Sequence, residues 1–343
     1  MSVRPLFLAA ALLGADLALA ADTAVPEVSA TAATAAALQK ADAARSNADF
    51  KEAYAIYKTL ADQGNARAEA KIGTMYATGE LGKRDMAEAI AHYDKAAEAG
   101  DGYAQFLLGV AFRNGMGVEK HDTESGRWFA KAEENLRKAA LRQDAEAQYL
   151  LGIMYRDGTS VVESKKESGQ WLQKAAEKGN PPAQAAYGHF LYDENEDTAG
   201  LLTWWEKAAA QGDIGAQLNL ASAYTKGYYG VSKDQAKADE WYRRVIPTLE
   251  KSAEQGNVGA QFLLGRSYLK GEGLAANPEK AQEWLEKAAA QDDIAAQTTL
   301  GRSYLKGEGL PVDPAKARLW LEKAAAQGNK IARSLLDELP ENK

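Results

Sequence analysis

Small and apolar residues recur along this chain at helical spacing, in a pattern that repeats. Between residues 66 and 329 they stand four positions apart, as at Ala104, Leu108 and Phe112, which places them on one face of a helix. Glycines then interrupt the pattern, and a second apolar stripe, which carries a tryptophan in most units, follows. Each unit therefore predicts two helices.

The boundaries of both helices carry signals that agree with this interpretation. Gly271 ends a first helix, because glycine tolerates the left-handed conformation found after helix C-termini. The next helix opens with Asn277 and Pro278, an N-cap followed by proline at the first helical position. Asp85 and Glu88 have the spacing of a capping box.

The repeat length follows from the residue that ends each alanine-rich second helix. Successive junctions lie 36, 43, 36, 33, 44, 36 and 36 residues apart. The two longest units add seven residues to the second helix, which is about two turns, so the apolar face is preserved and these helices should protrude. The junction positions are Gly64, Gly100, Gln143, Gly179, Gly212, Gly256, Asp292 and Gly328.

The N-terminus has the pattern of an export signal. Arg4 supplies a positive charge, residues 6–13 form a short apolar stretch, and residues 18–20 fit a cleavage site between small residues. A membrane anchor is the alternative, but the stretch is too short to span a bilayer. No later segment approaches 18 uninterrupted apolar residues, so we expect no membrane span and a periplasmic protein that begins near Ala21.

The segments on either side of the repeat complete the predicted organisation. After a signal peptide at 1–20, residues 21–36 are rich in Ala, Thr and Ser, and we expect a flexible lead-in there. Residues 37–64 predict a helical hairpin of tetratricopeptide type, residues 65–329 form the repeat array, and residues 330–343 supply a C-terminal cap and tail.

The composition limits the ligands that the protein can bind and the reactions that it can catalyse. The net charge is −7, which disfavours nucleic acid because phosphate contacts need clustered Lys and Arg. There is no cysteine and only three histidines, so disulfides and thiolate metal sites are excluded and most catalytic schemes are disfavoured. We expect a non-enzyme with no cofactor and no metal.

The unit A-x-x-x-L-G-x-x-Y-x-x-G-x-G, followed by A-x-x-W-x-x-K-A-A-x-x-G, closely resembles the Sel-one-like repeat, a relative of the tetratricopeptide repeat. The resemblance covers residues 66–329. It implies an all-α fold, an α/α solenoid with a right-handed superhelix, in which about seven repeats place their first helices on a concave surface. It also implies a role in protein interaction, since the family contains adaptors, envelope-signalling regulators and host-factor binders. Some members are periplasmic immunity proteins that neutralise toxins of a type VI secretion system, lipases among them.

Candidate binding residues lie on the first helices, opposite the predicted packing face. If the helices stack as the resemblance implies, this row lines the groove, and it is rich in aromatic residues and Arg, which dominate interface hot spots. The alternative is that part of the row packs against neighbouring helices. We call these positions the inner row: Phe106, Val110, Arg113, Tyr149, Ile153, Arg156, His189, Tyr192, Phe262, Arg266 and Arg302.

Three hypotheses about the function remain open. The leading one is a non-catalytic periplasmic scaffold that binds a protein through its concave groove, with an acidic surface favoured by the arginines of the inner row. A narrower one is an immunity protein. The third is a penicillin-interacting hydrolase, because Ser267 and Ser303 each precede a lysine by three positions, although no K-T-G or S-D-N partner motif occurs.

Overall fold

The computed structural model describes residues 26–159 and 163–339, and these fall into two compact units. Unit 1 contains the described residues up to Thr78 together with Asp85–Ala238. Unit 2 contains Gly79–Arg84 and the described residues from Asp239 onward.

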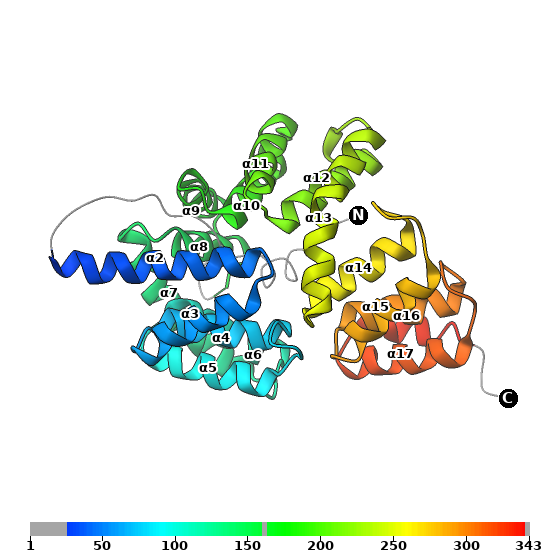
Figure 1. Ribbon diagram of the computed structural model, residues 1–343, viewed down its shortest axis with the longest axis horizontal. Coiled ribbons are helices and arrows are strands. Elements are labelled where there is room, and N and C mark those ends of the chain that lie inside the picture. The colour runs from blue at the N-terminus through cyan, green and yellow to red at the C-terminus, as the bar shows by residue number, and fades with distance from the viewer. Residues whose placement is uncertain (1–25, 160–162, 340–343) are drawn as a thin grey trace. The chain divides into compact units, whose positions relative to one another are not determined.

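The described part of the chain is helical throughout and contains no strand, so the predicted all-α solenoid of repeated helix pairs is confirmed (Figure 1). An N-terminal pair, α2 (Pro26–Ser46) and α3 (Phe50–Asp62), precedes seven repeats, and α18 (Lys330–Leu336) follows them. The first helices of the repeats are α4 (Ala66–Thr78), α6 (Gly102–Asn114), α8 (Ala145–Asp157), α10 (Pro181–Asn195), α12 (Ile214–Lys226), α14 (Val258–Lys270) and α16 (Ile294–Lys306). The second helices are α5 (Met86–Glu98), α7 (Asp122–Leu141), α9 (Lys165–Glu177), α11 (Thr198–Ala210), α13 (Gln235–Glu254), α15 (Pro278–Ala289) and α17 (Pro314–Ala326).

Helix ends form where the sequence signals place them. The Asp85 carboxylate accepts hydrogen bonds from the backbone N–H groups of Ala87 and Glu88, and Asn277 caps α15 in the same way. Gly271 ends α14 with φ +68°, in the left-handed region. The two long units have second helices of 20 residues, α7 and α13, as predicted.

The N-terminal boundary differs from the prediction. Helix α2 begins at Pro26, so the flexible lead-in expected over 21–36 is wrong for residues 26–36. The segment is rich in alanine, which has the highest helix propensity of all residues, and that propensity outweighs the low-complexity composition. Ala41 and Ala44 are buried and the helix contacts α3. The predicted signal peptide at 1–20 lies outside the described residues.

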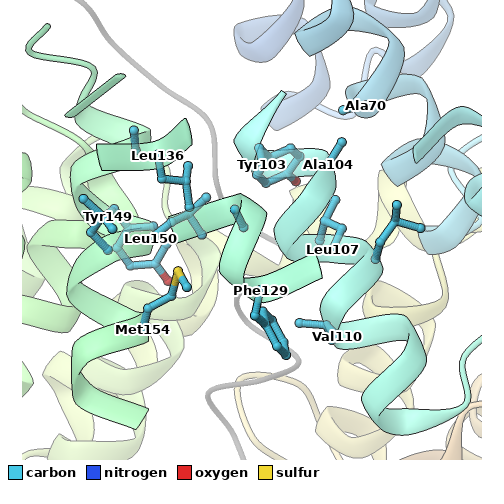
Figure 2. Close-up of a cluster of buried hydrophobic side chains, with 14 of the residues drawn as sticks. Ala70, Tyr103, Ala104, Leu107, Val110, Phe129, Leu136, Tyr149, Leu150 and Met154 are labelled. Carbon is cyan, nitrogen blue, oxygen red and sulfur yellow. The ribbon is translucent and has the colours of Figure 1, made fainter. Parts of the chain in front are cut away.

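A continuous apolar core runs through the repeats of unit 1 between α4 and α10. Figure 2 shows part of this cluster, with Tyr103, Val110, Phe129 and Tyr149 among its labelled side chains. All seven tryptophans lie on second helices. Six of them hold one slot, and each has the cation three residues later above its ring, 3.9–4.8 Å from the centroid. A ring covered in this way has a packing role, because the lysine or arginine stem shields it from water.

A ladder of buried glutamines joins each repeat to the one before it. Each glutamine lies near the start of a first helix, and its side-chain N–H donates to the backbone oxygen eight residues earlier, at the end of the preceding second helix, over 3.0–3.2 Å. These bonds satisfy carbonyl groups that a helix C-terminus leaves without partners. The glutamines are Gln105, Gln148, Gln184, Gln217, Gln261 and Gln297.

Candidate interaction surface

The inner row of unit 1 is carried by helices that touch one another. Within unit 1, α4 contacts α6, α6 contacts α8, and α8 contacts α10, although each is separated from the next by a second helix in the sequence. The eight inner-row positions from Phe106 to Tyr192 are therefore brought together on three adjacent helices, α6, α8 and α10. The other three positions belong to unit 2, on α14 and α16.

Three members of the inner row are buried, so the prediction that they line an open groove is wrong. Val110, Tyr149 and His189 are 6%, 7% and 9% exposed, respectively. The helical angle places them opposite the hairpin's own packing face, but neighbouring elements cover that side as well. The helix α8, which carries Tyr149, contacts both α6 and α10, and the rings of Trp205 and Tyr229 lie against His189. Burial raises the pKa of Tyr149 to about 12. Burial and the nearby Arg156 cation lower the pKa of His189 to about 3, so this ring stays neutral at physiological pH.

Five members of the row reach the surface in unit 1, three apolar or aromatic residues and the two arginines Arg113 and Arg156. Phe106, Ile153 and Tyr192 are half-buried, one on each of α6, α8 and α10. Phe106 contacts the buried Phe129 edge-on, with ring centroids 5.6 Å apart. The Arg113 guanidinium lies 5.2 Å from the centroid of the same Phe129 ring. These contacts hold two inner-row side chains in place from below.

Most arginines of the inner row are partnered by acids of their own chain. Arg156 forms a salt bridge with the adjacent Asp157 over 2.8 Å. In unit 2, Arg266 lies 3.9 Å from a carboxylate oxygen of Glu272, and Arg302 lies 3.4 Å from Glu308. Phe262 lies beneath the Arg266 guanidinium at 6.0 Å. The positive charge on which the expected acidic partner depends is therefore partly compensated within the chain.

The first helices also contain a buried network of charged side chains that the sequence analysis did not predict. Lys71 on α4 is 1% exposed, and its ammonium bonds to Glu146 on α8 over 3.0 Å. Arg67, also on α4, pairs with Glu146 and with Asp101 at the start of α6. The two cations lower the pKa of Glu146. The network ties three first helices together, and no sequence signal distinguishes it, because α4 and α8 each carry three charged residues among 13.

The sequence analysis also predicted only two members of a cluster of aromatic rings at α10. His189 and Tyr192 belong to the inner row, but the rings of Trp205 and Tyr229 join them. Tyr229 lies in a short turn of 3-10 helix, η1 (Tyr228–Gly230), where helical periodicity gives no information. We call Tyr192, Tyr228, Tyr229, His189 and Trp205 the aromatic cluster.

The two serines on which the hydrolase hypothesis depends are poorly placed for catalysis. Ser267 and Ser303 are 2% and 1% exposed, and a nucleophile must reach its substrate. Within residues 26–159 and 163–339, no group of three His, Cys, Asp or Glu side chains is arranged to hold a metal ion. No helix of the described residues combines the length and apolar character needed to cross a membrane.

The family model for the Sel1 repeat matches seven segments of this chain, and the chain belongs to that family. The repeats of this family and of its tetratricopeptide relatives are typical of non-catalytic protein-interaction scaffolds. The matched segments are 66–101, 102–143, 145–180, 202–213, 214–244, 258–293 and 294–329.

Solved structures include several similar repeat proteins. A Sel1 repeat protein from Oxalobacter formigenes is 28% identical over 75% of this chain and 96% of that chain, with a TM-score of 0.42. A protective antigen of uropathogenic Escherichia coli is 27% identical over 84% of this chain and 76% of its own, with a TM-score of 0.37. An immunity protein from Pseudomonas aeruginosa is 23% identical over 66% and 82%, with a TM-score of 0.42. No curated protein matches the chain.

Proposed function

We propose that this protein is a periplasmic scaffold that binds a partner protein through the inner row of unit 1. The observation that carries the proposal is the set of Phe106, Ile153 and Tyr192, three half-buried apolar side chains on three adjacent helices. Large apolar and aromatic residues held rigidly at a surface contribute most of the binding energy in protein interfaces.

Affinity capture with the chain from Ala21 to Lys343 tests the interaction. The bait is incubated with an envelope extract, and bound proteins are identified by mass spectrometry. A second bait carries Phe106→Ala, Ile153→Ala and Arg113→Glu. A third carries Leu141→Ala, a matched control, because Leu141 is an apolar side chain on α7 that is 69% exposed and lies outside the inner row.

A partner that binds the first and third baits but not the second supports the proposal, provided that circular dichroism melting shows all three folded. A partner that binds all three equally overturns the assignment to the inner row. The identity of the partner separates the two narrower roles: a secreted toxin indicates an immunity protein, and a resident envelope protein indicates an adaptor.

The location is tested separately. Residues 1–20 have the charge, apolar stretch and small-residue site of a cleavable export signal. We expect the full-length gene product to appear in the osmotic-shock fraction with Ala21 as its first residue, as measured by intact mass. A protein that keeps Met1 and stays with the cytoplasmic fraction would contradict the periplasmic assignment.

A further inference from the structure

Arg113 differs from the other arginines of the inner row because the chain supplies it with no acid. Arg156, at the same position on the adjacent helix α8, is followed by Asp157, and the two side chains form hydrogen bonds of 2.8 and 3.2 Å. Arg113 is followed by the neutral Asn114 instead. In the described part of the chain, no carboxylate lies within 4.0 Å of its guanidinium, which also makes no hydrogen bond there.

A buried ring holds the Arg113 guanidinium in place. Phe129 on α7 is 3% exposed, and the guanidinium carbon lies 5.2 Å from the centroid of its ring (Figure 2). Phe106, two helical turns before Arg113 on α6, contacts the same ring edge-on, with centroids 5.6 Å apart. Phe106 and Arg113 are both half-buried, so a fixed cation and an apolar side chain reach the surface beside each other. The ring face attracts the cation but offers no oxygen to its N–H groups.

The acids near Arg113 in the sequence do not serve it. Glu119 is exposed in the loop that follows α6, and no ion pair joins it to Arg113. Glu124, at the start of α7, pairs with Arg127 on its own helix. The dipole of α6 favours a cation in its last turn. That interaction does not require one, since α4 and α10 have no basic residue in their last turns.

A carboxylate is the group that completes this site. Its two oxygens accept two parallel hydrogen bonds from one edge of a guanidinium, and such charge-assisted bonds are stronger than neutral ones. A basic side chain would instead meet the Arg113 cation, and a neutral amide would accept hydrogen bonds without the charge. Phe106 offers an apolar contact beside the carboxylate, and rigidly held aromatic and arginine side chains dominate the energetics of interfaces.

We propose that Arg113 and Phe106 together receive an acidic side chain and a neighbouring apolar side chain of the partner protein. This inference rests on the proposed function, because both residues belong to the inner row of unit 1, and it adds the chemistry of the partner at that row. Ile153, half-buried on the adjacent helix α8, extends the apolar surface on which the partner lies.

The test uses two defined peptides in place of the natural partner. Acetyl-Leu-Ser-Asp-amide carries an apolar and an acidic side chain two residues apart, which places them on one side of an extended segment at a separation of about 7 Å. Acetyl-Leu-Ser-Asn-amide has the same shape without the charge. Each peptide is titrated into the chain from Ala21 to Lys343, and the backbone amide resonances of α6 are followed by NMR to obtain its dissociation constant.

We expect the acidic peptide to bind at least about fivefold more tightly than the amide peptide, because only the former makes charge-assisted hydrogen bonds. In Arg113→Gln this preference should disappear. In Phe106→Ala both peptides should bind more weakly by a similar factor, and the preference should remain. Arg127→Gln is the matched control, since Arg127 is an exposed arginine on α7 outside the inner row, and it should keep the full preference.

Equal binding of the two peptides, the absence of any saturable shift in α6, or a preference that survives in Arg113→Gln would overturn the inference. The comparison of the peptides on the unchanged chain does not depend on the folding of any variant. A negative result leaves the capture experiment intact, because a partner lost with the second bait still supports the scaffold. Conversely, a captured partner that binds all baits equally refutes the scaffold assignment, while the peptide result at Arg113 stands by itself.

Discussion

Asp213 shows how one residue of the repeat can oppose folding at neutral pH. It caps α12, and its side chain accepts a hydrogen bond from Ala216. Burial raises its pKa to about 6, above the usual value near 3.8. The folded state therefore binds the proton more tightly than the unfolded state. The stability from this group is fully present below about pH 4 and is lost as the pH rises through 6.

Replacing Asp213 with asparagine should remove this penalty and keep the cap, because Asn180 and Asn257 hold the same slot in other repeats. We expect Asp213→Asn to stabilise the protein by about 1–3 kcal/mol at pH 7.5 and by almost nothing at pH 4. Urea midpoints at the two pH values measure this. Asp144→Asn is the control, since Asp144 lies near the Arg67 cation and should gain nothing from the change. An equal gain at both pH values would contradict the argument.

Helix caps could be predicted residue by residue, but burial could not. Asp85 and Asn277 act as the sequence indicates, because capping depends on residues three or four positions away. Tyr149 and His189 were misplaced because their exposure depends on other elements of the fold: α8 contacts the first helices on both sides, and Trp205 and Tyr229 lie against His189. Tyr229 was missed because no periodicity reaches into a turn.

At the scale of the element, the glycine in the middle of a first helix sets how closely the two helices of a hairpin approach, and six of the seven first helices have it, α12 carrying Ala221 instead. A Cβ atom at Gly152 would lie 2.7 Å from the Leu172 side chain and 3.2 Å from its backbone nitrogen. We expect Gly152→Ala to destabilise the protein by about 1–3 kcal/mol, since the core cannot absorb the added carbon without shifting a helix.

The matched control is Gly126→Ala on α7, where no atom lies within 4 Å of the added carbon. This variant should be neutral or stabilised by up to about 1 kcal/mol, because alanine is the better helix former. Thermal melts of the two variants give the comparison. Similar losses in both would show that close helix approach is not the reason for glycine at 152.

Element lengths were largely predictable, because each depends on local periodicity and glycine punctuation. The 20-residue lengths of α7 and α13 follow from the spacing of the junction residues, which is 43 and 44 residues in these two units. The first part of helix α2, residues 26–36, was not predicted, since a run of small residues is compatible with a flexible linker or with a helix. The high helix propensity of alanine selects the helix there.

At the scale of the whole molecule, each repeat depends on its neighbours for stability. Arrays of this kind behave as a chain of units coupled to their nearest neighbours. Leu321 on α17 and Leu172 on α9 are both fully buried, but Leu321 lies in the last repeat and Leu172 has repeats on both sides. Each Leu→Ala change should cost about 2–5 kcal/mol in its own core.

We expect Leu321→Ala to speed amide hydrogen exchange mainly in α16–α18, and Leu172→Ala to speed it on both sides, from α8 to α11. Exchange measured by mass spectrometry on peptide fragments resolves these regions. A uniform rise along the whole chain in both variants would mean that the repeats unfold as one cooperative block.

The glutamine ladder has a consequence for how such a chain can grow. Each rung takes its donor from the start of one repeat and its acceptor from the end of the repeat before it. An in-frame duplication of a whole unit therefore supplies both the glutamine donor and the backbone acceptor of a new rung. The interfaces on both sides of the added repeat are then the same as those already present. Residues 258–293 and 294–329 are identical at 24 of 36 positions, as expected of such a pair. The array can lengthen by gene duplication, while partial copies leave a rung broken.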